Sequence, residues 1–340
     1  MSARRFFALF SSIYILFSLL SCRRAAVPPQ AEQVLGTVCA VNAFEGGTQQ
    51  LYEELFARLA EIDARFSTTR DDSDLSTVNA AAGLHAVKVH EDVLFVVGRA
   101  LDYARLSDGA FDPSIGPLVR LWGINTDHAR VPAQEEIDAV LPLVDWHKIE
   151  LDENACTIFL QEKGMALELG GIAKGYAADE LVKILDARKV RRAIIDLGGN
   201  VYVYGKKKDG SDWKVGVKNP LEAEGEPALV LSLGRNISVV TSGVYERFFI
   251  ADGIRYHHIL DTRTGRSADG DCLSATIVAA SSLEADALST TAFLLGAEKY
   301  SAISDVPAIF INSDASVSAS SSLAPRLRAQ SPVFSAIKYF

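Results

Sequence analysis

The sequence is short of cysteine, and the cysteines it has are poorly placed to pair. Four occur in 340 residues, and Cys39, Cys156 and Cys272 lie far apart with no Cys-x-x-Cys spacing among them. We therefore predict that these three thiols are unpaired and pack as small apolar side chains. With 49% hydrophobic residues, the chain is long and apolar enough to bury a large core without cross-links.

An excess of positive charge is also missing. Lysine and arginine number 34 against 43 aspartate and glutamate residues, which gives a formal net charge of −9. This balance argues against a protein that coats nucleic acid, so we expect no nucleic-acid partner. A small anionic ligand would have to be held by a few cations placed in its own site.

Nothing in the sequence divides the main body of the chain. There is no repeat of fixed period, no low-complexity tract and no Gly-, Ser- or Pro-rich linker between Val34 and Phe340. Residues 34–340 are therefore predicted to form a single domain, with two sublobes.

The apolar run at the start of the chain is too short for a typical membrane span. It extends from Phe6 to Leu20 after two arginines, whereas a spanning helix needs about 20 apolar residues. The basic start and apolar middle predict a secretory signal peptide over residues 1–21, with a membrane-anchoring helix as the alternative. The sequence Leu-Leu-Ser-Cys at 19–22 resembles a bacterial lipobox, which implies cleavage before Cys22 and lipidation of that residue.

Lipidation would tether the mature protein outside the cytoplasm, because several acyl chains give stable attachment to a bilayer. Residues 22–33 are rich in Ala, Pro and Gln and have no amphipathic period, so we predict a flexible tether there. We expect the protein to be lipid-anchored to a bacterial membrane, on the periplasmic side of the inner membrane.

Hydrophobic periodicity predicts few helices among many strands. Helices are predicted at 48–66, 91–106, 133–141, from Lys174 to about Arg188, and 282–295. Strands are predicted at 34–44, at three places within 148–169, and at 193–197, 201–205, 213–217, 229–233, 238–241, 248–251, 256–260, 274–279, 308–312 and 317–319. Runs of strands separated by few helices favour the α+β class, with largely antiparallel sheets and packed helices.

The stretch LELGGIAKGYAADEL, residues 167–181, joins a predicted strand to a helix through two glycines. Gly170 and Gly171 allow the backbone to approach a ligand closely. Lys174 lies in the first helical turn, where the helix dipole favours an anion. A phosphate held between the turn and this lysine would explain both features. The alternative is a solvated lysine above a tight turn.

Two further segments combine residues in unusual ways. Gly109–Ile124 (GAFDPSIGPLVRLWGI) is a loop constrained by prolines and glycines, which either contributes to a site or simply packs a buried Trp122. Thr241–Ala268 alternates like a hairpin and brings His257 and His258 to one end. Because neighbouring strand residues point to opposite faces, only one of these histidines can face a site. A structural role for the histidine is the alternative.

The segment EADALSTTAFLLG, residues 284–296, places a carboxylate beside a hydroxyl. Asp286 and Thr290 are four residues apart and share one face of the predicted helix. With a carbonyl and phosphate oxygens they would suit Mg²⁺, which prefers hard oxygen ligands and takes few of them from the protein. The alternative is a capped helix with an internal hydrogen bond from Asp286 to Thr290.

Taken together, FDPSIGPLVRLWG, LELGGIAKGYAADE, SGVYERFF with HHILDTRTG, and DALSTTAFLLG resemble in order and spacing the ApbE family, the FAD:protein FMN transferases. The resemblance covers nearly all of the mature chain. It implies an ApbE-like fold and an Mg²⁺-dependent enzyme that splits FAD, transfers FMN to a threonine of a target protein and releases AMP. Targets in this family include extracytoplasmic flavin-bearing subunits of ion-pumping redox complexes.

The resemblance also implies roles for individual residues. It makes His258 the catalytic base and Lys174 the cation that holds the phosphates. The implied metal ligands are Asp286, Ser289, Thr290 and the backbone carbonyl of Gly171. The implied FAD-binding residues are Thr69, Ala110, Phe111, Asp112, Glu168, Lys174 and Leu260.

At three of these positions the sequence departs from the family. Glu168 replaces the usual Asp, Ser289 stands where many members have Asp, and Thr69 stands where many have an aromatic residue. Loss of an aromatic platform at Thr69 would loosen product retention and favour hydrolysis, which some treponemal relatives perform. The alternatives to protein flavinylation are therefore an FAD pyrophosphatase that yields FMN and AMP, and a periplasmic lipoprotein that binds FAD without turnover.

Overall fold

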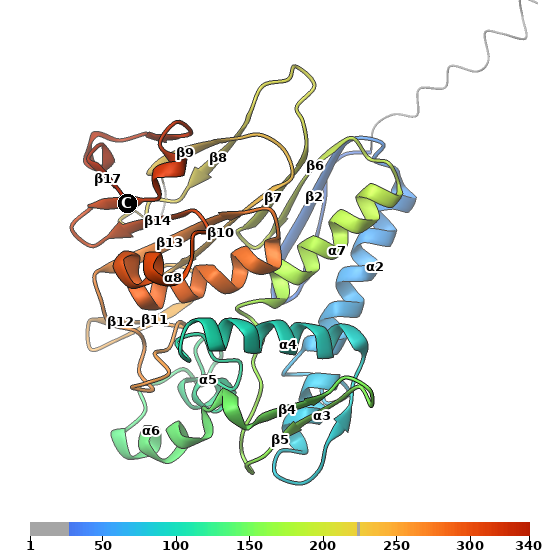
Figure 1. The fold of residues 1–340 in the computed structure, drawn as a ribbon, viewed down its shortest axis with the longest axis vertical. Coiled ribbons are helices and arrows are strands. Elements are labelled where there is room, and N and C mark those ends of the chain that lie inside the picture. Colours follow the sequence, from blue (N-terminus) through green and yellow to red (C-terminus); the bar gives the residue numbers. More distant parts are fainter. Residues whose placement is uncertain (1–26, 223–224) are drawn as a thin grey trace, which may run out of the picture.

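The computed structural model describes residues 27–222 and 225–340. This part of the chain combines seven α-helices with strands that pair almost entirely antiparallel (Figure 1), so the predicted α+β class is confirmed. The predicted signal peptide at 1–21 and the lipidation site Cys22 lie outside the described residues. Within the described ranges, no helix has both the length and the apolar character needed to cross a membrane.

A nine-stranded sheet forms the centre of the molecule. Its strand order is β1-β2-β6-β7-β10-β13-β14-β15-β17, and all neighbours are antiparallel except β15 and β17. The strands are β1 (Gln30–Val34), β2 (Thr37–Glu45), β6 (Arg192–Leu197), β7 (Asn200–Gly205), β10 (Ile237–Gly243), β13 (Cys272–Ala279), β14 (Ala308–Asn312), β15 (Val317–Ala319) and β17 (Ile337–Tyr339).

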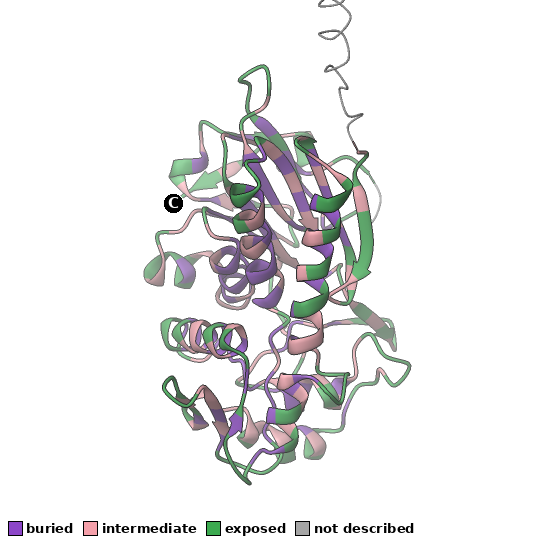
Figure 2. Ribbon diagram, turned by 90° about the vertical axis from the view of Figure 1, so that its right-hand side faces the viewer, coloured by how far each residue is buried: buried purple, intermediate pink, exposed green. Residues whose placement is uncertain are grey.

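Both faces of this sheet are covered, so its strands are largely buried (Figure 2). Three helices lie on one face: α2 (Gln49–Phe66), α7 (Ala173–Ala187) and α8 (Ser282–Ile303). A three-stranded sheet packs on the other through a second apolar cluster, in the order β16-β9-β8. These strands are β16 (Leu327–Ala329), β9 (Leu229–Leu233) and β8 (Trp213–Val217).

The other end of the molecule holds the remaining helices and a small sheet (Figure 1). The helices are α3 (Asp74–Ala80), α4 (Glu91–Leu106), α5 (Gly116–Trp122) and α6 (Gln134–Val140). The small sheet has the order β3-β5-β4, with β3 (Val87–Lys88), β5 (Thr157–Leu160) and β4 (Ile149–Asp152). A separate hairpin, β11 (Phe248–Ala251) and β12 (Ile254–His257), packs against α5 because Phe249 and Tyr256 stack together beside Trp122.

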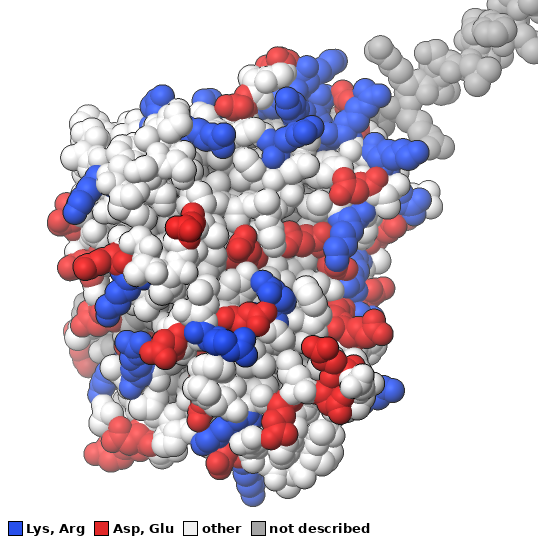
Figure 3. Space-filling model, viewed as in Figure 1, with Lys and Arg blue, Asp and Glu red and all other residues white. Residues whose placement is uncertain are grey.

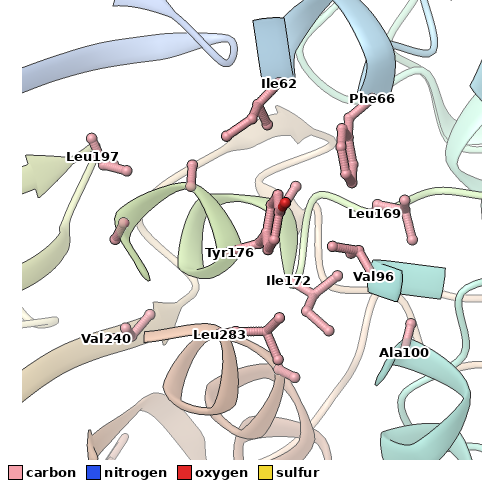
Figure 4. Close-up of a cluster of buried hydrophobic side chains, with 14 of the residues drawn as sticks. Ile62, Phe66, Val96, Ala100, Leu169, Ile172, Tyr176, Leu197, Val240 and Leu283 are labelled. Atoms are coloured by element: carbon pink, nitrogen blue, oxygen red, sulfur yellow. The ribbon is translucent and has the colours of Figure 1, made fainter. Parts of the chain in front are cut away.

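The main core fixes the start of α7 between three other helices. Tyr176 stacks on Phe66 of α2, with ring centroids 5.8 Å apart. Figure 4 shows Tyr176 and its neighbour Ile172 between side chains of α2, α4 and α8, among them Val96 and Leu283. The Gly170-Gly171 turn that leads into α7 is therefore held in place by the core.

The long amphipathic helices are where the spacing predicts them. In α2 the apolar residues at three- and four-residue intervals are all buried, and the Thr48 hydroxyl caps the helix by accepting a hydrogen bond from the backbone N–H of Leu51. Helix α4 has the predicted bounds. Helix α8 continues beyond the predicted end at Leu295, across a kink at Gly296 where φ is 71°.

Two predicted strands differ in the structure. The third strand expected within 148–169 is absent, because residues 165–169, all buried except the half-buried Glu168, have no strand beside them to pair with, apart from an isolated bridge between Ile115 and Ala166. The strand predicted at 256–260 ends at His257, since the backbone of Ile259 turns to accept a hydrogen bond from Ala268 N–H.

The ends of the described chain contain strands that were not predicted. Residues 30–33, part of the predicted tether at 22–33, belong to β1 because they pair with β2 in continuous register. At the other end, β16 and β17 follow the predicted last strand, and the polar segment after α2 contains the short helix α3. Short elements of this kind carry too few apolar residues to show a period.

Three cysteines lie within the described residues, and all are free, as predicted. Cys39 is buried in the core, whereas Cys156 and Cys272 are half-buried. Burial raises the pKa of the Cys39 and Cys272 thiols to about 12, so neither is a thiolate at neutral pH. These thiols behave as packing residues.

Candidate active site

A cavity of about 320 Å³ opens where the first half of α8, the loop before α5 and the end of the β11–β12 hairpin meet. It collects residues from all four segments that the sequence singled out. The predicted site residues that line it are Ala110, Phe111, Asp112, Glu168, Gly171, Lys174, His258, Leu260, Asp286 and Thr290.

Two Leu-Gly-Gly turns contribute backbone to the cavity wall. One is the predicted Gly170-Gly171 turn, and the other, Gly198-Gly199, joins β6 to β7. A Cβ on Gly171 would lie 3.1 Å from the ring of Phe111 and 3.4 Å from Thr290 Oγ1, so a larger residue would require the Phe111 ring to move by a few tenths of an ångström. The second turn was missed, although the same Leu-Gly-Gly follows an acidic residue at both places.

Asp286 is buried in α8, and one of its oxygens is fixed by the backbone of α7. Its Oδ2 accepts a hydrogen bond from Gly175 N–H at 2.8 Å. Its Oδ1 lies 3.6 Å from Lys174 Nζ. No hydrogen bond joins Asp286 to Thr290 among the described residues, so the alternative of an internal bond along the helix is not observed.

Helix α7 holds α8 at two points that are one turn apart. Gly175 donates to Asp286, and Asp179 caps the start of α8 by accepting hydrogen bonds of 2.8 to 3.0 Å from residues 281–283. A carboxylate at a helix N-terminus is also favoured by the helix dipole. These contacts fix the register of the two helices and with it the position of Asp286.

Gly175→Ala is expected to destabilise the protein by about 1–3 kcal/mol, as overpacking usually does. A Cβ there would lie 2.3 Å from Ser282 O and 2.7 Å from Asp286 Cβ, so the two helices would have to separate. Urea unfolding measures the effect. Gly98→Ala in α4 is the control, because its Cβ would meet only Leu151 at 3.6 Å; equal stability of the two variants would contradict the role of close packing at Gly175.

Hydroxyl groups of α8 and β10 meet at the cavity wall. Thr290 Oγ1 is 3.3 Å from Ser242 Oγ of β10, and both residues line the cavity. Ser289, the remaining predicted ligand, is buried and is not one of the lining residues. Its hydroxyl donates to the carbonyl oxygen of Asp286 and lies 2.8 Å from Ser242 Oγ. Ser289 therefore supports the site through Ser242.

Lys174 and Glu168 both contact Gly170 on the cavity wall. Lys174 Nζ donates to Gly170 O at 2.8 Å, and Glu168 Oε2 accepts from Gly170 N–H at 2.9 Å. Burial raises the pKa of Glu168, an effect opposed by the Gly170 hydrogen bond and by the charge of Lys174. Because Lys174 contacts both Gly170 and Asp286, it is not the solvated lysine of the alternative interpretation.

His258 follows β12 directly and lines the cavity. Its backbone N–H donates to the carbonyl oxygen of Arg247 at 3.0 Å, and its Nδ1 lies 3.2 Å from the same oxygen. A carbonyl oxygen only accepts, so Nδ1 carries the hydrogen and Nε2 keeps a lone pair. Burial, followed by the charge of Arg247, lowers the pKa of His258 to about 4. The ring is therefore neutral at pH 7 and able to accept a proton.

The neighbouring His257 has a structural position instead. It is 5% exposed, its Nε2 lies 2.9 Å from Ala268 O, and its ring meets Phe293 edge-on. Burial lowers its pKa. Only His258 of the pair lines the cavity, as the alternation of strand residues predicts.

The Ala110-Phe111-Asp112 turn lines the cavity, but the carboxylate of Asp112 is used within the loop. Its Oδ1 accepts from the N–H and hydroxyl of Ser114 at 2.8 and 2.6 Å, and its Oδ2 accepts from Trp146 N–H at 3.1 Å. Burial raises the pKa of Asp112. The turn thus offers a ligand its backbone and the ring of Phe111.

Leu260 belongs to an apolar end of the cavity. It is buried in a cluster with Leu118, Ile137 and Trp122. The indole nitrogen of Trp122 donates to Gly265 O at 2.8 Å, which ties α5 to the turn after Leu260. Residues 116–122 of the predicted loop form the helix α5, and its last residue, Trp122, is buried and also lines the cavity, so the two interpretations of this segment both hold.

Thr69 is the predicted FAD-binding residue that does not line the cavity. It is exposed between α2 and α3, and its hydroxyl lies 3.1 Å from Ser67 Oγ. It does not line the cavity with the other predicted FAD-binding residues.

Oxygen atoms dominate the polar side of the site. In the described part of the chain, no group of three or more His, Cys, Asp or Glu side chains is placed to hold a metal ion. The oxygen atoms of the cavity wall that could bind a metal ion are those of the Asp286 carboxylate, the Thr290 and Ser242 hydroxyls, and the Gly171 backbone. A metal ion here would need further ligands from water or from a molecule bound in the cavity.

Comparison with known proteins identifies similar chains. Residues 35–310 match the sequence model of the ApbE family. An FAD:protein FMN transferase of Treponema pallidum is 39% identical over 320 residues, which cover 88% of each chain. Another from Klebsiella pneumoniae is 39% identical over 278 residues, or 80% of this chain and 85% of that one. The crystal structure of an ApbE protein from Thermotoga maritima matches with a TM-score of 0.80 and 30% identity, covering 88% of this chain and 99% of that one.

Proposed function

The chain belongs to the ApbE family and is an FAD:protein FMN transferase; we propose that it works with Mg²⁺, attaches FMN to a threonine and releases AMP. The observation that carries this proposal is the meeting, in one cavity, of the Asp286 carboxylate, the Gly170-Gly171 turn and His258. These groups would contact the metal, the diphosphate and the attacking hydroxyl.

The oxygen donors fit Mg²⁺. This ion is usually held by one or two carboxylates together with water and substrate phosphates. Gly175 N–H bonds Oδ2 of Asp286, so Oδ1 would be the carboxylate oxygen left for the metal, and Thr290 and Gly171 of the same cavity would supply further oxygens. When bound, Mg²⁺ would neutralise the negative charge of the diphosphate.

The chain's own groups would hold the rest of the diphosphate. Lys174 Nζ lies 3.6 Å from Asp286 Oδ1, so the lysine is close enough to the carboxylate that would hold the metal for both to act on one diphosphate. The glycine turn admits the phosphate close to the backbone. Both groups act by positioning and by electrostatic stabilisation.

His258 would take the proton from the acceptor threonine at Nε2, the ring nitrogen left free by the Arg247 carbonyl. The threonine oxygen then bonds to the phosphorus of the FMN half. The bond from that phosphorus to the bridging oxygen breaks, and AMP leaves with the bridging oxygen and its electron pair. FMN remains on the acceptor through a phosphoester bond.

We also propose where this reaction takes place. The lipobox-like sequence that ends at Cys22 supports a lipid anchor on the periplasmic side of the inner membrane. Acceptors would then be extracytoplasmic subunits of redox complexes that carry FMN on a threonine. The short tether before β1 would keep the enzyme close to such membrane-bound targets.

One incubation tests the proposed activity. Protein, FAD and Mg²⁺ are mixed with and without a purified acceptor domain, and products are separated by gel fluorescence and chromatography. We expect a fluorescent acceptor band and an equal amount of AMP. Free FMN and AMP with no labelled band would indicate an FAD pyrophosphatase, and FAD left intact would indicate a binding protein. Replacing the acceptor threonine with alanine is the control for the attachment site.

A further inference from the structure

Arg247 lines the cavity, yet the proposed function gives its side chain no part. It lies in the SGVYERFF segment, immediately before β11, and is half-buried. Its guanidinium has five N–H donors. Within the described chain it makes one hydrogen bond, a long one of 3.4 Å to Gly36 O.

The guanidinium of Arg247 forms no ion pair within the described chain, although its charge acts at longer range on the carboxylate of Glu168. Among the described residues, no Asp or Glu oxygen lies within 4.0 Å of its guanidinium. Lys174 differs, because its Nζ is 3.6 Å from Asp286 and also donates to Gly170 O. Most N–H groups of the Arg247 guanidinium therefore have no hydrogen-bond acceptor in the described chain. Because the side chain is half-buried, leaving these groups unpaired costs free energy.

This cation is not part of a general basic surface. Figure 3 shows acidic and basic side chains interspersed over most of the face in view, with Lys and Arg gathered only at its upper end. The whole chain carries a net charge of −9. The positive charge of Arg247 on the cavity wall is therefore a feature of this site and not of the surface as a whole.

Arg247 is held in place from both sides. The hairpin that follows it is anchored through Phe249 against Trp122. The turn that its guanidinium meets is also anchored, since Leu35 N–H donates to Asp63 Oδ1 at 3.1 Å. Because the backbone on both sides of the guanidinium is anchored, less conformational entropy is lost when the Arg247 side chain becomes ordered on a ligand.

The same residue orients His258. The carbonyl oxygen of Arg247 is the acceptor for both the backbone N–H and Nδ1 of His258. The reacting hydroxyl must lie at Nε2 of this ring, and the phosphorus that it attacks lies one bond beyond. Both side chains line one cavity and the charge of Arg247 acts on the His258 ring, so a phosphate beside the reacting hydroxyl would lie near the guanidinium.

We propose that the guanidinium of Arg247 binds the phosphate of the FMN half of FAD, an assignment that rests on the proposed function. Its planar fork can make two parallel hydrogen bonds to phosphate oxygens, as arginine does at many phosphate sites. It holds the phosphate while His258 takes the proton from the acceptor. The AMP phosphate is left to Lys174 and the metal.

Equilibrium binding without Mg²⁺ tests this proposal, because FAD is then not split. For Arg247→Ala we expect the Kd of FAD and of FMN, followed by flavin fluorescence, to rise about 10- to 100-fold, the usual worth of a charged hydrogen bond. Riboflavin lacks the phosphate, so its Kd should stay within about twofold. The Kd of AMP, measured by calorimetry, should also stay within about twofold. Arg247→Lys keeps the charge without the fork and should recover part of the FMN affinity.

Arg255→Ala is the matched control. Arg255 lies on β12 of the same hairpin with its guanidinium 4.5 Å from the centre of the Phe248 ring, and it does not line the cavity. All four affinities should be unchanged in this variant. Unchanged FMN affinity in Arg247→Ala, an equal loss of riboflavin affinity, or a loss confined to AMP would each overturn the proposal. Failure of the wild type to bind FAD would instead refute the proposed function.

Discussion

Replacing Asp286 with asparagine is expected to abolish Mg²⁺-dependent release of AMP from FAD while leaving the protein folded. The amide oxygen of asparagine can still accept the hydrogen bond from Gly175 N–H, but the negative charge that would attract Mg²⁺ is lost. Stabilisation by a bound metal is worth several kcal/mol, so the rate should fall by at least about 10³-fold. Chromatographic assay of AMP measures the rate, and circular dichroism checks the fold.

Asp286→Ala separates the charge of this residue from its structural contact. It removes the same charge but also leaves the buried N–H of Gly175 without a partner, which costs about 1–3 kcal/mol. We therefore expect equal loss of activity in the two variants and lower stability to urea in the alanine variant. Binding of Mn²⁺, followed by electron paramagnetic resonance, reports on the metal without turnover. Wild-type Mn²⁺ affinity in either variant would rule out Asp286 as a ligand.

His258→Ala is expected to slow FMN transfer about 10²- to 10⁴-fold, the usual contribution of a general base. FAD affinity should change little, because the ring acts on the acceptor hydroxyl. Single-turnover transfer and FAD binding are measured on the same preparation. The control is His257→Ala, which should lower stability and leave the rate per folded molecule within a few fold. A parallel loss of affinity and rate in His258→Ala would indicate that His258 is structural.

The pH dependence of transfer gives a second measure of His258. A general base works only when unprotonated, and the pKa of this histidine is lowered from 6.5 to about 4. Activity should therefore be retained below pH 6 and be lost as the pH falls through about 4. An acid limb of kcat/KM near pH 6.5 would contradict the lowered pKa of His258.

The parts of the fold that the sequence predicted well are those with a clear local period. The helices at 49–66 and 91–106 have apolar stripes long enough to identify, and both are confirmed. Residues 165–169 are just as apolar but pair with no strand, because their surroundings come from the loop before α5 and from the core. Pairing partners are a property of the tertiary structure, so local pattern alone could not exclude a strand there.

In the site, too, local spacing could be predicted from the sequence and tertiary contacts could not. Asp286 and Thr290 were predicted on one helix face from their spacing, and both line the cavity. Gly175 was not predicted, because its role depends on Asp286, which lies 111 positions away in the sequence. Arg247 was not predicted, because its position beside His258 depends on the pairing of β11 with β12. Thr69 was expected in the site from the family resemblance alone, and no physical feature of its segment supported that placement.

The strand order of the large sheet has a practical consequence for engineering. Its first strand in the sequence, β1, and its last, β17, form opposite edges. With about 4.8 Å between neighbouring strands, the eight steps across the sheet separate these edges by roughly 38 Å. Many domains have adjacent ends that a few residues can join, but circular permutation of this one would require a linker that crosses the whole molecule.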